Sequence, residues 1–318
     1  MSGRYDWVSF TTDYGRSDGF VAACVGVIAR IAPHVRVLDI THDIDAGDVR
    51  GGATVLAHTA AYLPAAVHLA VVDPGVGTAR RGVAVVAGGN VLVGPDNGLL
   101  APAADALGGV TAAYHLTERG FWLPAVSSTF HGRDVFAPVA AHLANGVDPA
   151  ELGPEVAAAD LVRRPEPVVH ARAGRLAAQV LALDRFGNVQ LTATRHDLAA
   201  TGFVPGQELT VTVNGPPSNL PRAVPREPFI PDWPPPGDAP TERSPRPRRP
   251  PREPFVPEPP PPCRTATATV GHTFADVEPG QLVVLVDSAG RVAIAANGTS
   301  AARLLAVTAG TLVELRPA

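Results

Sequence analysis

The chain has 318 residues, of which 46% are hydrophobic, and this length allows one large domain or two ordinary ones, each with its own core. Its formal net charge of −4 argues against a nucleic-acid-binding protein, which usually carries a basic face. All 26 basic residues are arginine, so a P-loop lysine, a Schiff base and a lysine general base are excluded.

The first half of the chain alternates strand-like and helix-like patterns. They predict, in chain order, strand 7–13, helix 19–33, strand 35–40, helix 48–64, strand 67–73, a hairpin over 81–96, strand 111–117 and helix 134–146. The first two helices end at prolines, and Pro138 is expected to kink the last one. Residues 1–165 are therefore predicted to form an α/β domain, a layered sheet with flanking helices.

Beyond Pro165 the pattern changes to short apolar runs separated by turn residues. Strands are predicted at 175–184, 187–192, 207–213, 280–287 and 291–297. This spacing indicates a smaller all-β domain over residues 166–318, either a barrel or a sandwich.

A proline-rich insert interrupts the second domain. Residues 216–262 hold 20 of the 34 prolines, so the insert is expected to be extended or disordered. The motif PREPF occurs twice within it, at Pro225 and Pro251, which suggests a small duplication. A tolerated loop insertion is the favoured interpretation, and a ligand for proline-binding domains is the alternative.

Two cysteines, Cys24 and Cys263, are too few for a disulfide framework or a cysteine zinc site. The first ten residues lack the apolar core of a signal peptide. No apolar run approaches the ~20 residues of a membrane span. We therefore expect a cytoplasmic protein with no membrane partner and no nucleic-acid partner.

The stretch VVDPGVGTARR, residues 71–81, carries the first chemical signal. It is not a dinucleotide-binding turn, because Arg80 occupies the third glycine position and a strand follows where a helix is required. Asp73 instead stands at the carboxyl end of a predicted strand, as Asp13 and Asp39 do in theirs, so the three acids could meet in one crevice. The alternative for each acid is a capping or turn role.

Two further polar clusters, THD at 41–43 and TFHGRD at 129–134, strengthen the functional interpretation. A metal site built from His42, Asp43, Asp45 and His131 is a further alternative. These residues lack the HxxxH or CxxC spacing of known metal motifs, so no metal is expected.

Seven segments, in order, resemble the S-adenosylmethionine hydroxide adenosyltransferases, which are adenosine-forming hydrolases related to fluorinase and chlorinase enzymes. They are FTTDYGRSDGFVAACVGVI, DITHDIDAGDVRGGA, VHLAVVDPGVGTARRGVAV, VGPDNGLL, TFHGRDVFAPVAAHLA, LDRFGNVQLT and TFADVEPGQLVVLVDSAGRVAIAANGTSAA. The resemblance implies an α/β domain, a barrel-like β-domain, and a homotrimer with active sites between subunits. It also implies hydrolysis of S-adenosyl-L-methionine (SAM) to adenosine and L-methionine, without a cofactor.

The resemblance also implies roles for individual residues. Asp73, Arg80 and His131 match the catalytic trio: Asp73 and His131 would hold and polarise the water, and Arg80 would keep Asp73 ionised. Substrate contacts are implied for Asp13 at the ribose hydroxyls, Asp18 and Asp184 at the methionine ammonium, Ser288 at its carboxylate, Asn188 at the adenine edge and Phe274 stacked on adenine. Without the resemblance, Phe274 could be a core residue and Asn188 a turn residue.

The chain departs from its halogenating relatives at several matched positions. They carry an aromatic residue at Asp73, a tyrosine and a serine at His131 and Gly132, arginines at Ala289 and Ala296, and a tryptophan at Gly47. A carboxylate at the attack position would repel a halide, which disfavours the first alternative, a SAM-dependent halogenase. The second alternative is a non-catalytic protein that binds SAM or adenosine.

Overall fold

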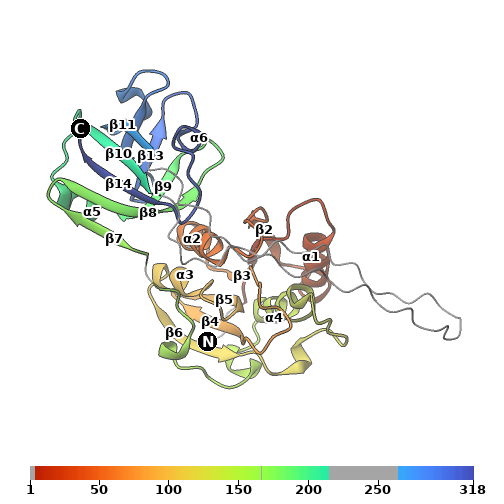
Figure 1. The fold of residues 1–318 in the computed structure, drawn as a ribbon. Coiled ribbons are helices and arrows are strands. Elements are labelled where there is room, and N and C mark those ends of the chain that lie inside the picture. The colour runs from red at the N-terminus through yellow and green to blue at the C-terminus, as the bar shows by residue number, and fades with distance from the viewer. Residues whose placement is uncertain (1–3, 166, 215–263) are drawn as a thin grey trace, which may run out of the picture. The chain divides into compact units, whose positions relative to one another are not determined.

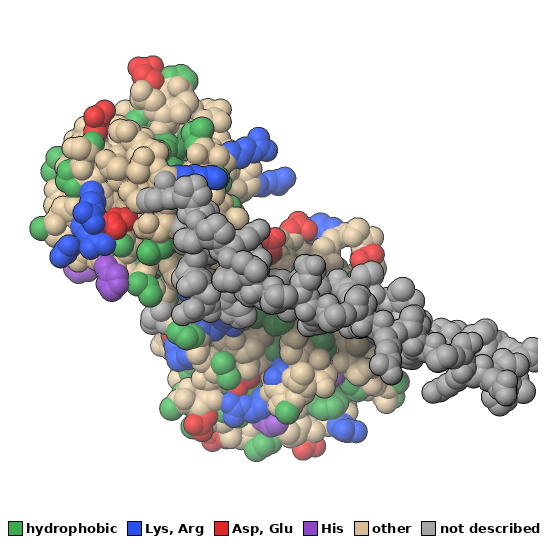
Figure 2. Space-filling view, in the orientation of Figure 1, with side chains coloured by type: hydrophobic (Ala, Val, Ile, Leu, Met, Phe, Trp, Pro, Cys, Tyr) green, Lys and Arg blue, Asp and Glu red, His purple; other side chains and the backbone are tan. Residues whose placement is uncertain are grey.

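The computed structural model describes residues 4–165, 167–214 and 264–318, and the chain divides into two units, Met1–Glu166 and Pro167–Ala318 (Figure 1). The predicted insert at 216–262 lies outside the described residues. On the visible face of the described residues, hydrophobic side chains are scattered rather than gathered into one patch (Figure 2).

A six-stranded mixed sheet forms the centre of the first unit, in the order β2-β1-β3-β5-β4-β6. Its strands are β1 (Trp7–Thr12), β2 (Arg36–Thr41), β3 (Val67–Val71), β4 (Gly82–Ala87), β5 (Asn90–Pro95) and β6 (Val110–His115). Strands β2, β1, β3 and β5 are parallel, whereas β4 pairs antiparallel with β5 and β6. The predicted hairpin is confirmed, and Gly88 and Gly89 supply the positive φ angles of its turn, 53° and 77°.

Helices cover both faces of this sheet because its strands are apolar on both sides (Figure 1). In β3, Val67, Leu69 and Val71 face the core shared with α1 (Phe20–Ile31) and α4 (Ala137–Ala144). Ala70, which lies between them in the strand, faces the opposite core, shared with α2 (Val49–Ala60) and α3 (Ala101–Ala106). The predicted layered α/β architecture is confirmed.

Local sequence explains where the helices begin and end. The Asp48 side chain accepts a hydrogen bond from the Gly51 backbone and caps α2. The expected helix at 134–146 begins differently: a π-helical turn, η2 (Gly132–Phe136), precedes α4. Pro138 follows directly on this π-helical turn, where the Ala137 N–H donates to the Gly132 carbonyl, so helical hydrogen bonding continues from η2 into α4. The expected kink at Pro138 stays a prediction.

Short 3₁₀ turns and peripheral elements complete the two units. In the first unit they are η1 (Arg119–Phe121), η3 (Pro149–Leu152) and η4 (Ala158–Asp160). In the second unit they are α5 (Arg195–Thr201), η5 (Phe274–Asp276) and α6 (Ala301–Leu305). None of the helices in the described ranges has both the length and the apolar character that a membrane crossing requires.

The second unit is a closed seven-stranded barrel. Its strands are β8 (Arg175–Leu183), β9 (Val189–Thr194), β10 (Glu208–Asn214), β11 (Arg264–Val270), β12 (Leu282–Val286), β13 (Arg291–Ala296) and β14 (Leu312–Pro317). They pair in the order β14-β10-β11-β12-β13-β9-β8, and pairing of β8 with β14 closes the ring, while β7 (Val169–Arg172) adds to β8 from outside. The barrel interpretation is confirmed over the sandwich.

Candidate active site

Asp73 and Arg80 form a bidentate ion pair just beyond the carboxyl end of β3. Arg80 Nε lies 3.0 and 2.9 Å from the two Asp73 carboxylate oxygens, and Arg80 Nη2 lies 2.5 Å from Oδ2. The two side chains are only 13% and 5% exposed, so solvent screens the pair weakly. The turn between them therefore fixes one carboxylate in a defined orientation.

His131 joins this pair through Arg80. Arg80 Nη2 lies 3.0 Å from His131 Nδ1, and a guanidinium can only donate, so Nδ1 accepts and the neutral ring carries its proton on Nε2. Burial, and after it the Arg80 charge, lowers the pKa of His131 below its ordinary value. The structure thus brings the three predicted catalytic residues together, with Arg80 between Asp73 and His131.

Close packing of two loops explains how residues so distant in sequence meet. Gly77 has a φ of 77°, and a Cβ there would stand 2.5 Å from the Ser128 carbonyl oxygen. The Asp134 carboxylate, which is fully buried, accepts from the Ser127 backbone at 2.8 Å and from Arg133. Burial opposes ionisation of Asp134, but these hydrogen bonds hold its pKa below the ordinary value. The TFHGRD cluster therefore shapes the loop that carries His131.

Asp13 follows β1 and accepts a hydrogen bond from the Gly47 backbone at 2.8 Å. The THD cluster supports the turn that contains it: His42 Nδ1 lies 2.9 Å from Thr12 Oγ1, and the His42 carbonyl accepts from Gly15. Asp18, in the same loop, is exposed. The structure thus makes His42 a buried support of the Asp13 turn.

Asp39, the third strand-end acid, has partners of its own. It lies 3.1 Å from His42 Nε2 and 3.7 Å from Arg16. The alternative metal set is not assembled, because His42 pairs with Asp39 and His131 pairs with Arg80. Across the residues that the structure describes, no three His, Cys, Asp or Glu side chains are grouped as metal ligands.

Tyr14 is a site residue that the sequence did not indicate. Its hydroxyl lies against Gly132, where a Cβ would collide with it, and the charges of Asp13, Asp73 and Arg80 all act on its pKa. The hydroxyl therefore lies against the residue that follows His131, and His131 is joined to Asp73 through Arg80. An aromatic residue after a strand-end acid looks like core in a sequence, and only the Gly132 contact reveals its position.

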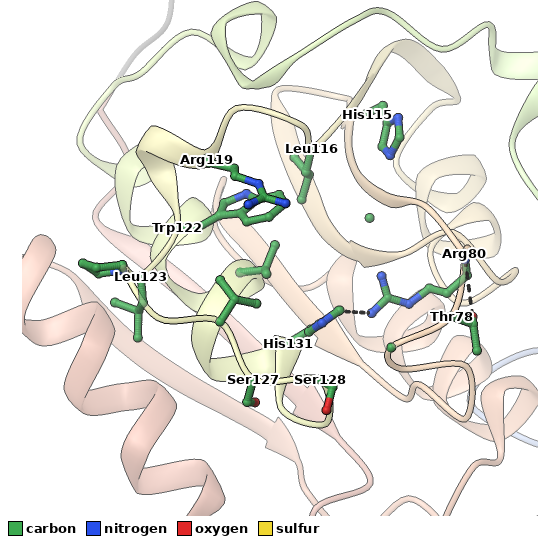
Figure 3. Close-up of a pocket in the computed structure, with 15 residues that line it drawn as sticks. Thr78, Arg80, His115, Leu116, Arg119, Trp122, Leu123, Ser127, Ser128 and His131 are labelled. Carbon is green, nitrogen blue, oxygen red and sulfur yellow. Dashed lines mark hydrogen bonds between the residues drawn. The ribbon is translucent and has the colours of Figure 1, made fainter.

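A cavity of about 600 Å³ adjoins two members of the trio, Arg80 and His131 (Figure 3). Arg80 and His131 line it at one side, and the Arg119 guanidinium lies 5.6 Å from the Trp122 ring centroid at another. Asp73 does not line the cavity. The hydrogen-bonded Arg80–His131 pair is therefore reached from this cavity, separately from the carboxylates.

The remaining predicted residues lie on loops of the second unit. Asp184 and Asn188 share the β8–β9 loop, where Asn188 Nδ2 donates to Asp184 Oδ2 at 2.6 Å. Ser288 lies in the exposed β12–β13 turn, and Phe274 begins η5 with 49% of its surface exposed, so it is not a core residue. Phe186, in the Asp184 loop, is 78% exposed and was not predicted.

Comparison with known proteins places this site in a family. Residues 8–153 match the model of the SAM hydroxide adenosyltransferase N-terminal domain, and residues 261–314 match that of its C-terminal domain. An (R)-S-adenosyl-L-methionine hydrolase from Salinispora tropica is 50% identical over 305 residues, covering 96% of this chain and 95% of the relative. A fluorinase from Nocardia brasiliensis is 28% identical over 258 residues, covering 73% and 84%.

A solved structure agrees with the sequence matches. An uncharacterized conserved protein from Thermotoga maritima superimposes with a TM-score of 0.74 at 28% identity, covering 97% of this chain and 99% of that one. Identity of one residue in two along nearly the whole length, together with both domain matches, is decisive. The chain belongs to the SAM hydroxide adenosyltransferase family.

Proposed function

We propose that this protein hydrolyses S-adenosyl-L-methionine to adenosine and L-methionine. The observation that carries the proposal is the Asp73–Arg80 ion pair at the end of β3, in a chain half identical to an (R)-S-adenosyl-L-methionine hydrolase. A fixed carboxylate can accept a proton from water, which is what attack by a neutral nucleophile requires.

The proposed hydrolysis mainly requires that the water is positioned in line with the carbon–sulfur bond that breaks. The water oxygen attacks the ribose 5′ carbon in line, the carbon–sulfur bond breaks, and its electron pair leaves with sulfur as a neutral thioether. The water proton passes to Asp73 and then to solvent, so each turnover releases one proton. Because the sulfonium is already an activated leaving group, orientation in a water-poor site supplies much of the acceleration.

Each member of the trio has its own part in this proposal. Asp73 holds the water and accepts its proton. Arg80 keeps Asp73 ionised and fixes its two oxygens. His131 accepts from Arg80 through Nδ1 and so holds the guanidinium in place. The expected direct contact between His131 and the water stays a prediction. No metal or cofactor takes part.

The substrate contacts extend the proposal across both units. Asp13 accepts hydrogen bonds from the ribose hydroxyls, and Asp18 and Asp184 hold the methionine ammonium. Ser288 donates to the methionine carboxylate. Asn188 contacts the adenine edge, and Phe274 stacks on its face, which its exposure permits.

The proposal also covers the oligomeric state of the protein and its location in the cell. The catalytic trio belongs to the first unit, while Asn188, Phe274 and Ser288 belong to the second. We propose a homotrimer whose sites form between the first domain of one subunit and the second domain of its neighbour. We further propose a cytoplasmic enzyme that acts on a small molecule and has no nucleic-acid or membrane partner.

Product analysis with each sulfonium epimer tests the function. The purified protein is incubated with (R)-SAM or (S)-SAM in ¹⁸O-water, with and without chloride or fluoride, and products are separated by chromatography and weighed by mass spectrometry. We expect adenosine labelled at its 5′ hydroxyl, from the (R) epimer. A 5′-halogenated adenosine would instead indicate a halogenase, and bound SAM without product would indicate a binding protein.

A further inference from the structure

The Tyr14 hydroxyl joins two parts of the site that are far apart in sequence. Its residue directly follows Asp13, and its backbone N–H donates to Thr12 Oγ1 at 3.2 Å, which fixes it at the end of β1. A Cβ at Gly132 would collide with the hydroxyl, so the hydroxyl lies against the residue that follows His131. The phenol therefore reaches from the Asp13 turn to the start of η2.

Two phenylalanines fix the direction of this side chain. The Tyr14 ring meets Phe130 in a T-shaped contact, with centroids 5.7 Å apart, and meets Phe20 at 6.1 Å. Phe20 and Phe130 also contact each other at 5.0 Å. Such edge-to-face packing restricts rotation of the ring, so the hydroxyl is held in place before any substrate binds.

The hydroxyl is a donor placed beside the predicted catalytic trio, because it contacts Gly132, the residue after His131, and Arg80 binds both His131 and Asp73. Burial is the main reason that the pKa of Tyr14 lies well above its ordinary value, and Cys24, Asp13 and Asp73 raise it further, whereas Arg80 lowers it. The phenol thus keeps its proton at neutral pH. The contacts of its side chain with described residues are the steric one at Gly132 and the ring contacts with Phe20 and Phe130, and none of them uses the O–H donor.

We propose that the Tyr14 hydroxyl donates a hydrogen bond to the nucleophilic water while Asp73 accepts one from the same water. This assignment rests on the proposed hydrolysis. A water held in this way gives one hydrogen to Asp73 and receives one from Tyr14, and its remaining lone pair is left for the ribose 5′ carbon. Tyr14 is a second catalytic residue that touches the nucleophile.

This pair of contacts also selects the nucleophile. Water both donates and accepts, and so satisfies Asp73 and Tyr14 together. A halide could accept from Tyr14 but has no hydrogen to give to Asp73, whose charge would repel it. The donor and acceptor therefore fit water and reject an anion of similar size.

Tyr14→Phe removes the donor and keeps the ring, so it tests the assignment directly. We expect kcat to fall on the order of 10-fold, the worth of one hydrogen bond, with KM for SAM and affinity for adenosine nearly unchanged. Tyr5→Phe is the matched control, because the Tyr5 hydroxyl donates to the Gly89 carbonyl at 3.2 Å, outside the site, and its kcat should equal that of the wild type.

A double-mutant cycle with Asp73→Asn separates a shared water from a structural effect. If both residues hold one water, Tyr14→Phe should cost much less in the Asp73→Asn background than in the wild type. An unchanged kcat in Tyr14→Phe, or fully additive losses, would overturn the assignment while leaving the hydrolysis intact. A wild-type protein that forms no adenosine from either SAM epimer would overturn both proposals.

Discussion

Neighbouring arginines at the end of the 73–81 turn have different partners. Arg80 points to Asp73 and His131, whereas Arg81 Nε and Nη2 lie 2.9 and 2.6 Å from Asp96 Oδ2. The Asp96 side chain is 3% exposed, and its other oxygen accepts from the Val162 backbone. Arg81 therefore ties the turn to the body of the first unit, and Arg80 serves the site.

Alanine substitutions should separate these two parts. Arg80→Ala leaves Asp73 without its partner and should lower kcat about 10²-fold, as loss of one preorganised electrostatic group does. Arg81→Ala leaves the buried Asp96 unpaired and should lower the free energy of unfolding by about 1–3 kcal/mol. Steady-state kinetics and urea unfolding measure the two effects, and equal changes in both variants would show that the assignments are wrong.

Substitution of Asp73 and His131 tests the proposed order of importance. Asp73→Asn removes the proton acceptor and should lower kcat by about 10²–10⁴-fold, and His131→Ala should lower it less, because His131 acts through Arg80. SAM binding, measured by calorimetry, should change little in either variant, and a chelator should not affect the wild type. A larger loss in His131→Ala than in Asp73→Asn would favour direct contact between His131 and the water.

At the scale of elements, a buried histidine links the strands beneath the site. His68 in β3 is fully buried, with Nδ1 2.7 Å from Ser9 Oγ in β1 and Nε2 3.2 Å from Asn90 Oδ1 in β5. This set looks like a hydrolytic triad, but it has no exposure to substrate. Burial lowers the pKa of His68 to about 4. The network joins three parallel strands as long as the ring stays neutral.

Acid should therefore weaken the first unit. Because the pKa of His68 is lower in the folded state than in the unfolded state, its contribution is complete above about pH 6.5 and is lost as the pH falls towards 4, by about 3 kcal/mol in total. His68→Gln should flatten that part of the stability curve, measured by urea unfolding at several pH values. His170→Gln, at an exposed position in β7, is the control and should retain the wild-type slope.

The sequence predicted those helices and strands that bury an apolar face against neighbouring elements, because such burial requires a regular pattern of apolar residues. Helices α1 and α2 showed apolar periodicity, although α2 ends at Ala60, four residues before the proline that was expected to end it. Strand β10 alternates clearly, and β8, β9, β12 and β13 were found as short apolar runs. Strand β7 has mixed burial because it lies outside the closed ring, and β11 and β14 are rich in Thr or charged residues, so they were not predicted. The π-helical turn has no sequence signal of its own.

The site was predictable only in part, for a related physical reason. The end of β3 drew attention to Asp73 because parallel strands place functional groups there. The contact between Arg80 and His131 joins residues 51 positions apart, and only the family resemblance brought them together. Tyr14 was not predicted, because its hydroxyl reaches this position only where Gly132 has no Cβ, and a sequence does not show that contact.

For the whole molecule, the division of site residues between two units leads to a complementation test. Asp73→Asn and Asn188→Ala should each be inactive alone, since one lacks the proposed proton acceptor and the other a proposed substrate contact. If the proposed trimer forms, some sites of mixed assemblies combine an intact first domain with an intact second domain and should recover activity. Mass measurement must confirm mixing, and mixed trimers without activity would mean that each site forms within one chain.

The barrel itself should tolerate removal of the proline-rich insert. Val213 and Arg264 are paired across β10 and β11, so the strand ends already lie side by side. Replacement of residues 217–262 by a short Gly/Ser linker should keep the fold, the assembly and SAM hydrolysis, measured by circular dichroism, light scattering and kinetics. Loss of turnover in a well-folded variant would make the insert part of the site.

The β10–β11 pairing has an evolutionary consequence. Strand pairing within a closed ring fixes the two ends of the joining segment, while doubling the length of such a segment adds only about 0.6 kcal/mol of closure cost. Selection on the barrel therefore acts weakly on how many residues lie between these strands. Descendants of one ancestor can lengthen, shorten or replace the segment while the 73–81 turn in the other unit stays unchanged, which makes this joint a natural point for acquiring new sequence.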